Sequence, residues 1–143
     1  MKKRFWIAVV SKEHVLRGVE GNYMQACHGK KAPLARMKKG DGFLFYSSKI
    51  SMNRDEKCQA FTAIGVVKDD IVYQFQMSES FIPFRRNIDF FKSENVSILP
   101  LIEDLEFIQD KKYWGYNFRY GFLEIGEKDF NFIQSKMRID EYQ

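Results

Sequence analysis

The apolar residues of this chain fall into short runs separated by polar residues and glycines. The run from Phe5 to Val10 is aromatic and β-branched without a polar interruption, which is typical of a strand buried on both faces. Similar patterns predict further strands at 42–47, 58–67, 71–77, 84–91 and 122–125. Residues 68–70, Lys-Asp-Asp, predict a hairpin turn between the strands at 58–67 and 71–77.

Helical signals lie near both ends of the chain. Ser11 is a suitable N-cap for a short helix that Gly21 ends, and Pro33 suits the first turn of a second helix that reaches Met37. Apolar stripes predict two more helices, one at 100–108 with Leu101, Leu105 and Ile108, and a C-terminal one with Phe130, Ile133 and Met137. Because strands outnumber helices and hairpin-like connections dominate the middle, we expect a small mixed α+β barrel rather than a doubly wound sheet.

Length and composition are those of a globular domain. The chain has 143 residues, of which 45% are hydrophobic and 29% charged, so we expect a single domain covering residues 1–143. The run at 5–10 is far shorter than the roughly 20 residues needed to cross a bilayer, and it does not suit a signal peptide. Cys27 and Cys58 give no disulfide framework. Free thiols and a cytoplasmic location are therefore expected.

The charge is distributed unevenly along the chain. The net charge is +4, from 23 Lys and Arg against 19 Asp and Glu. Residues 1–39 carry ten basic and two acidic residues, a net of +8, so the remainder carries −4. This asymmetry is expected of a surface that meets a polyanion if the basic residues converge on one face, and of an ordinary solvated surface if they do not.

The residues do not form a persuasive catalytic or metal-binding pattern. Met24 stands where a phosphate-binding P-loop ending in Gly29-Lys30 requires glycine, and the chain has no Gly-x-Ser-x-Gly. Cys27 and His28 are adjacent, so in an extended chain they point to opposite faces. Together with His14 and Cys58 they match no zinc-finger spacing. We therefore expect no catalytic residues, no metal and no cofactor.

Aromatic and basic residues alternate in two segments. One is Phe84-Arg85-Arg86, and the other runs from Trp114 to Gly121. Aromatic faces stack on bases and arginines neutralise phosphates, so this mixture suits an extruded base or a single strand. The alternative is that these rings only cover the core.

Several motifs in order resemble those of the EVE domain, also called UPF0310, which has a PUA-like fold related to YTH and ASCH domains. The motifs, which span about Phe5 to Met137, are VVSKEHV at 9–15, HGKKAPL at 28–34, GD at 40–41, FTAIG at 61–65, FIPFRR at 81–86 and WGYNFRYGFLEI at 114–125. The resemblance implies a PUA-like pseudo-barrel with short helices packed around it. Members of this superfamily commonly bind RNA or modified bases.

The resemblance also implies a ligand pocket. Ser11 and Lys12 resemble strand-end residues that meet the ligand, and Phe84 stands where relatives usually carry tryptophan, so it stacks with less area and offers no indole donor. The other implied pocket residues are Asn22, Tyr23, Gln25, Trp114, Tyr116 and Arg119, with His28 and Ser47 at the rim.

Both lines of reasoning favour a non-catalytic module that binds RNA or DNA. A base, in particular a modified one, would enter the aromatic pocket, while Lys12, Lys30, Lys31, Arg85 and Arg86 hold the phosphates. The alternative is a sensor that binds a free nucleoside or another planar metabolite in the same pocket. An enzyme ranks last, because its only candidate groups are Ser11, Cys27 and His28. The preferred base and the oligomeric state stay open.

Overall fold

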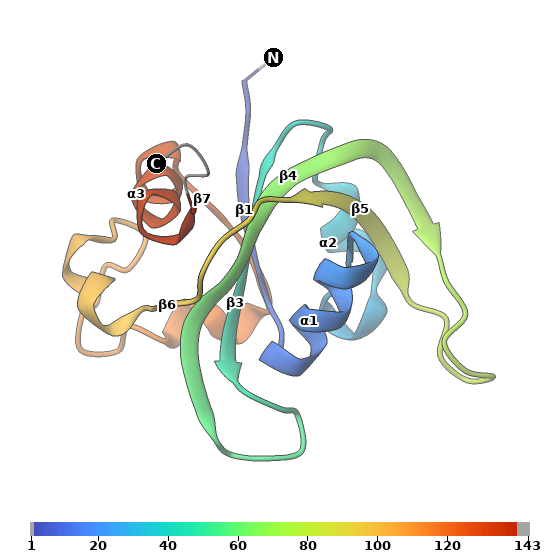
Figure 1. Ribbon diagram of the computed structural model, residues 1–143, viewed down its shortest axis with the longest axis horizontal. Helices are drawn as coiled ribbons and strands as arrows, with labels where there is room; N and C mark the ends of the chain where they lie inside the picture. Colours follow the sequence, from blue (N-terminus) through green and yellow to red (C-terminus); the bar gives the residue numbers. More distant parts are fainter. Residues whose placement is uncertain (1, 140–143) are drawn as a thin grey trace.

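The computed structural model describes residues 2–139, and its centre is a mixed sheet in the strand order β2-β5-β4-β3-β1-β7 (Figure 1). Strand β1 (Phe5–Val9) pairs parallel with β3 (Gly42–Lys49) and antiparallel with β7 (Phe122–Ile125). The long β4 (Lys57–Gln74) pairs antiparallel with β3, β5 (Phe84–Phe90) and β6 (Val96–Ser97), and β2 (Tyr23–Met24) pairs with β5. The α+β class is confirmed.

The middle strands are buried on both faces. Phe5 and Ile7 of β1 contribute to one apolar cluster, and Trp6 and Ala8 contribute to the other. This division follows from the period of two along a strand, which sends alternate side chains to opposite faces. The interpretation of the first strand as doubly buried is therefore confirmed.

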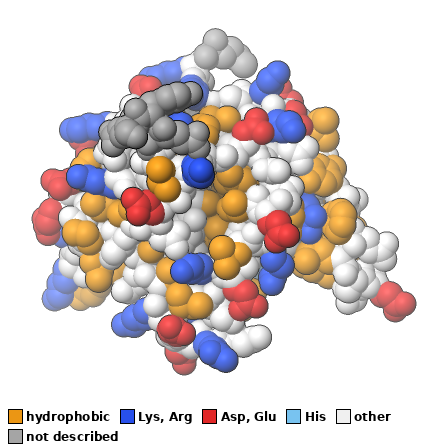
Figure 2. Space-filling view, viewed as in Figure 1, with side chains coloured by type: hydrophobic (Ala, Val, Ile, Leu, Met, Phe, Trp, Pro, Cys, Tyr) orange, Lys and Arg blue, Asp and Glu red, His pale blue; other side chains and the backbone are white. Residues whose placement is uncertain are grey.

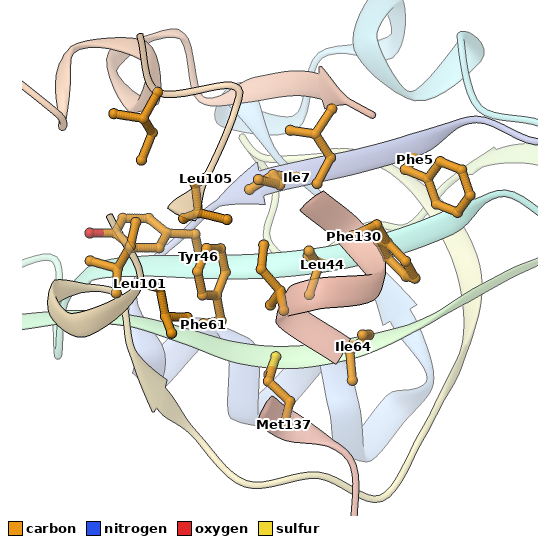
Figure 3. Close-up of a cluster of buried hydrophobic side chains, with 14 of the residues drawn as sticks. Phe5, Ile7, Leu44, Tyr46, Phe61, Ile64, Leu101, Leu105, Phe130 and Met137 are labelled. Carbon is orange, nitrogen blue, oxygen red and sulfur yellow. The ribbon is translucent and has the colours of Figure 1, made fainter. Parts of the chain in front are cut away.

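Helices cover the two clusters separately (Figure 1). Helix α3 (Glu127–Met137) and the 3-10 helix η2 (Leu99–Asp104) cover one face, and Figure 3 shows Phe130 and Met137 of α3 among the side chains of β1, β3 and β4. The other face carries α1 (Lys12–Gly21) and α2 (Lys31–Ala35). Two further 3-10 helices are η1 (Cys27–Gly29) and η3 (Tyr116–Tyr120). Within residues 2–139, no helix has the length and apolar character of a membrane span.

The predicted hairpin turn at 68–70 is wrong. Strand β4 continues through these residues, and its register against β5 shifts between Val67 and Val72. The two carboxylates make contacts that keep the chain in the sheet, because Asp69 accepts a hydrogen bond from Asn87 and Asp70 accepts one from the backbone N–H of Lys39. The reversal of direction occurs further on, at residues 75–83, in a hairpin that projects from the molecule (Figure 1).

The helix predicted at 100–108 is also shorter than expected. Only η2 is helical, although Leu101, Leu105 and Ile108 are all buried as the stripe predicted. The carboxylate of Asp129 accepts hydrogen bonds from the amides of residues 106 and 107, at 2.9 and 2.8 Å, so these amides are not available to continue a helix.

The other helix predictions hold with small changes in their bounds. Ser11 caps α1 by accepting a hydrogen bond from the N–H of His14, and α3 buries Phe130, Ile133 and Met137. Helix α2 begins at Lys31, two residues before the proline that was expected in its first turn.

Candidate functional site

A cavity of about 550 Å³, called the main cavity below, opens where β1 and β3 end beside the start of α1. Its polar wall consists of Ser11, His14, Arg17, Gln25, His28, Ser48 and Lys49, and its other wall residues are Val9, Val10, Ala26, Cys27, Gly29, Met52, Met77, Phe81 and Gly121. These residues include two cations and no carboxylate. A cavity of this size and mixed lining is suited to a small organic ligand.

His14 is the third residue of α1, and its side chain is partly buried in the wall of the main cavity. Its Nε2 atom is buried and has no hydrogen-bond partner among the described residues. Burial lowers the pKa of His14, and the positive charges of Arg17 and Arg85 lower it further. The imidazole is therefore neutral at pH 7.

The wall at 27–29 has an unusual backbone. Cys27, His28 and Gly29 have φ values of 52°, 59° and 81°, all in the left-handed region. Glycine is required at position 29, because a Cβ there would lie 2.6 Å from the Cβ of Pro83. Burial raises the pKa of the Cys27 thiol, which disfavours a reactive thiolate. The strained turn fixes the wall of the main cavity against the hairpin at 75–83.

Arg85 lies behind the main cavity and holds Gln25 in place. Its guanidinium group lies 3.7 Å from the ring centre of Tyr23 and 4.1 Å from that of Phe75. Its Nε donates to Oε1 of Gln25 at 2.8 Å, so the amide nitrogen of Gln25 faces the sulfur of Met77 at 3.5 Å. With only 6% of its surface exposed, Arg85 is not placed to hold a phosphate on the outside.

Arg86 is even less accessible, and the expectation that it contacts a phosphate is corrected. It is 1% exposed and donates hydrogen bonds to the carbonyl oxygens of Leu34, Met37 and Asp69, at 2.6, 2.7 and 2.6 Å. These bonds join α2 and the bulge of β4 to β5. Its role in this structure is to hold the fold.

The structure brings only some of the predicted pocket residues together. Ser11, Gln25 and His28 line the main cavity, and Ser48 does so in place of Ser47. Ser47 is fully buried with its hydroxyl 2.8 Å from that of Thr62. Because neighbouring strand residues face opposite sides, the serine at the rim is the next one along β3.

The other predicted residues up to Phe84 lie outside the wall. Asn22 ends α1 in the left-handed conformation, and Tyr23 stacks on Arg85. Phe84 packs against the apolar cluster under α1 and α2, with the ammonium of Lys31 5.8 Å from its ring centre. Lys12, the first residue of α1, is half-buried, and Lys30 is exposed at the start of α2.

The aromatic segment near residue 115 is also separate from the main cavity. Trp114 and Tyr116 line neighbouring hollows, and the exposed guanidinium group of Arg119 stacks on Tyr116 at 3.7 Å and donates to the hydroxyl of Tyr120 at 2.9 Å. Only Gly121, at the end of this segment, reaches the main cavity.

Sequence reasoning missed several residues of the wall. Ser11, His14 and Arg17 are spaced three residues apart, which places them on one face of the helix. Since Ser11 was already a candidate, this spacing could have predicted His14 and Arg17 as wall residues. Lys49 follows Ser48 at the end of β3. No local pattern predicts Met77 and Phe81 as wall residues, because they reach the cavity only through the hairpin at 75–83. The sequence pattern predicts the turn at 68–70 instead and so does not predict this hairpin.

The residues described here hold no group of three or more His, Cys, Asp or Glu side chains that is suited to bind a metal ion. The candidate site is therefore the main cavity, with hydrogen-bonding groups, apolar surfaces and cations in its wall.

Known proteins similar to this chain agree with this architecture. The EVE domain family matches residues 4–136. A UPF0310 protein from Streptococcus gordonii is 50% identical over 137 residues, covering 96% of this chain and 95% of its own, and one from Mycolicibacterium gilvum is 47% identical over 135 residues, covering 94% and 96%. The solved structure of Rpa0253 from Rhodopseudomonas palustris has a TM-score of 0.55 at 15% identity, covering 92% of this chain and 91% of that one, and shows the same fold.

Proposed function

Because the chain belongs to the EVE domain (UPF0310) family, we propose that it is a non-catalytic module that binds nucleic acid by admitting one base, in particular a modified one, into the main cavity. Membership of this family suggests a PUA-like binding domain. The observation that carries the proposal is the lining of the main cavity, which combines two cations with neutral hydrogen-bonding groups and lacks carboxylates. Such a wall favours an anionic ligand with a planar, partly apolar body.

The neutral groups and the apolar surfaces suit a base. Ser11, Gln25 and Ser48 offer hydroxyl and amide groups for base edges, and Phe81 offers a ring for stacking. Met52 and Met77 add adaptable apolar surface that accommodates an extra methyl group. These features support selection of a modified base.

The two cations suit the backbone of a nucleic acid. Arg17 lies 3.8 Å from Glu13, and Lys49 lies 3.6 Å from Asp55, with all four side chains at least half exposed. Exposed ion pairs of this kind contribute little to stability, so a phosphate replaces these carboxylates at little cost. Lys12 and Lys30 directly follow the wall residues Ser11 and Gly29 in the sequence, so we expect them to add to the positive potential of the main cavity.

A second candidate is a sensor that binds a free nucleoside or another planar metabolite. The observation that favours it is the volume of the main cavity, which holds such a ligand without a strand attached. The two candidates differ in their dependence on salt. Binding of a strand releases counterions and weakens as salt rises, whereas binding of a neutral nucleoside does not.

The experiment is a titration by fluorescence anisotropy with short single- and double-stranded RNA and DNA that carry plain or modified cytosine and adenine. Two phosphate contacts in a single strand predict about sevenfold weaker binding when salt rises from about 50 to about 200 mM. Replacing both Arg17 and Lys49 by alanine removes most of this dependence. Lys136→Ala, an exposed cation on α3, serves as the charge-matched control.

The ring of Phe81 is tested in the same assay. Phe81→Ala weakens binding about fivefold or more, because one stacking contact is lost. Ile82→Ala is the control, since this exposed neighbour lies outside the wall of the main cavity. The proposal is contradicted if the two substitutions have equal effects or if the native protein binds no strand. Binding of free nucleosides alone supports the sensor instead.

A further inference from the structure

A smaller hollow of about 250 Å³ adjoins the main cavity. Ser48, at the end of β3, belongs to the walls of both. Beyond Ser48 the wall of this hollow includes Gln59, Lys112, Tyr113 and Trp114, and we call it the Trp114 hollow. A ligand that leaves the main cavity past Ser48 therefore enters an aromatic environment.

The Trp114 hollow combines exposed aromatic surface with an available cation. Tyr113 is 63% exposed, and Trp114 is half-buried beside it. The ammonium of Lys112 lies 5.4 Å from the ring centre of Tyr113, and none of the ion pairs found within residues 2–139 involves Lys112. A ring next to a cation without a carboxylate partner suits a base and its phosphate.

A bulge in the sheet shapes the boundary between the two spaces. The register of β3 against β4 shifts between Ser47 and Lys49, and on the other strand Gln59 has a φ of 51°, in the left-handed region that is rare for a residue with a side chain. Bulges of this kind redirect side chains and are frequent beside binding sites. Here the bulge brings Ser48 and Gln59 into the wall of the Trp114 hollow.

We propose that the Trp114 hollow binds the nucleotide next to the one whose base enters the main cavity, which rests on the proposed function above. The ligand is then a single strand of at least two consecutive nucleotides rather than a free nucleoside. The neighbouring base stacks on Tyr113 and Trp114, and Lys112 neutralises its phosphate. A base in a duplex is already stacked and paired, so the hollow selects unpaired strands.

A third hollow, on the other side of Trp114, does not meet the same requirements. It includes Asp110 and Tyr116 and has a volume of about 540 Å³, but none of its wall residues lines the main cavity. A strand that enters the main cavity therefore reaches the Trp114 hollow first. Tyr116 is 55% exposed, which makes it a matched control for Tyr113.

The test compares one nucleotide with four by isothermal titration calorimetry. The probes are CMP and AMP and unlabelled single-stranded tetranucleotides of cytidine and adenosine, as RNA and as DNA. Native protein binds the best tetranucleotide about tenfold or more tightly than the mononucleotide. Tyr113→Ala lowers the affinity for that tetranucleotide about fivefold or more and leaves the affinity for the mononucleotide unchanged, whereas Tyr116→Ala leaves both unchanged.

The charge of Lys112 has a separate readout. Lys112→Ala reduces the slope of log affinity against log salt by about 0.7 for the tetranucleotide, which is the contribution of one phosphate in a single strand. Because Lys112 and Tyr113 are exposed, both variants are expected to fold. A thermal unfolding temperature close to that of the native protein checks this expectation.

The outcomes separate this inference from the proposed function. If mononucleotide and tetranucleotide bind equally, if Tyr113→Ala weakens both alike, or if Tyr116→Ala causes the same loss, the inference is overturned and the role of the main cavity stands. If the native protein binds none of the probes, both are overturned.

Discussion

Neighbouring arginines of β5 illustrate how environment decides the role of a residue. Arg85 lies between two aromatic rings and orients the amide of Gln25, whereas Arg86 is bonded to three backbone carbonyl oxygens. The sequence pair Arg-Arg next to a phenylalanine predicts phosphate contacts for both. Their burial shows that neither meets a ligand from the outside.

Arg86→Met is expected to lower the free energy of unfolding by about 3 kcal/mol, because three carbonyl groups, two of them in buried hydrogen bonds, lose a charged donor. Arg54→Met, at an exposed position in the loop after β3, changes it by less than about 0.5 kcal/mol. Urea denaturation of both variants measures the difference. A loss of nucleic-acid binding by Arg86→Met without a loss of stability would contradict this assignment.

His14 makes the stability of the protein depend on pH. Its pKa is lower in the folded state than in the unfolded state, so the unfolded state binds more protons in the window below about pH 6.5. The stabilisation that comes from the neutral imidazole is present above that pH and is lost as the pH falls towards the pKa of the folded state.

We therefore expect the urea midpoint of the native protein to fall between pH 7 and pH 5, and His14→Gln to reduce this change. His28→Gln replaces an exposed imidazole in the same cavity wall and retains the native dependence. Carboxylates whose pKa is lowered by their partners, such as Glu124 beside Arg4, change the stability of the protein at lower pH. They therefore do not affect the comparison between pH 7 and pH 5. Identical pH profiles of native protein and His14→Gln would be evidence against a buried neutral imidazole.

Among the elements, α3 depends on one carboxylate for its position. Asp129, in its first turn, is 3% exposed and accepts both amide hydrogen bonds from residues 106 and 107. These bonds tie the helix to the chain that follows η2 and close the apolar cluster of Figure 3 on that side.

Asp129→Ala is expected to destabilise the protein by about 2 kcal/mol, because two partly buried amide hydrogen bonds lose their charged acceptor. Asp129→Asn retains one carbonyl oxygen and costs less. Hydrogen exchange at the amides of residues 106 and 107 measures the local effect directly. Slow exchange at both positions in Asp129→Ala would show that another group satisfies them.

The elements that the sequence predicts well are those with a strong local period. Strands 5–9 and 122–125 and helix 127–137 follow from residues that are close in the chain. The turn at 68–70 failed because Asp69 and Asp70 bind groups more than 15 residues away, which no local pattern reveals. Local patterns are likewise insufficient for the site. Ser11 and Gln25 were predicted, whereas Met77 and Phe81 enter the wall only because of the course of the hairpin at 75–83.

On the scale of the whole molecule, some cations of the positive N-terminal third make contacts within the protein. Figure 2 shows Lys and Arg interspersed with Asp and Glu over the visible face. Arg4 is bonded to Glu124 at 2.6 Å and stacks on Trp6, and Arg36 stacks on the same ring. Arg4 and Arg36 are therefore occupied by contacts within the protein, so the net charge of residues 1–39 alone does not locate the site.

The most direct test of the central claim is a map of amide chemical shifts during titration with a single-stranded tetranucleotide. The account predicts that the perturbed amides gather at residues 11–17, 25–29, 48–49 and 112–115, around the main cavity and the Trp114 hollow, and that those of α3 stay in place. Saturable binding with perturbations confined to α3 and η2, away from both spaces, would contradict it.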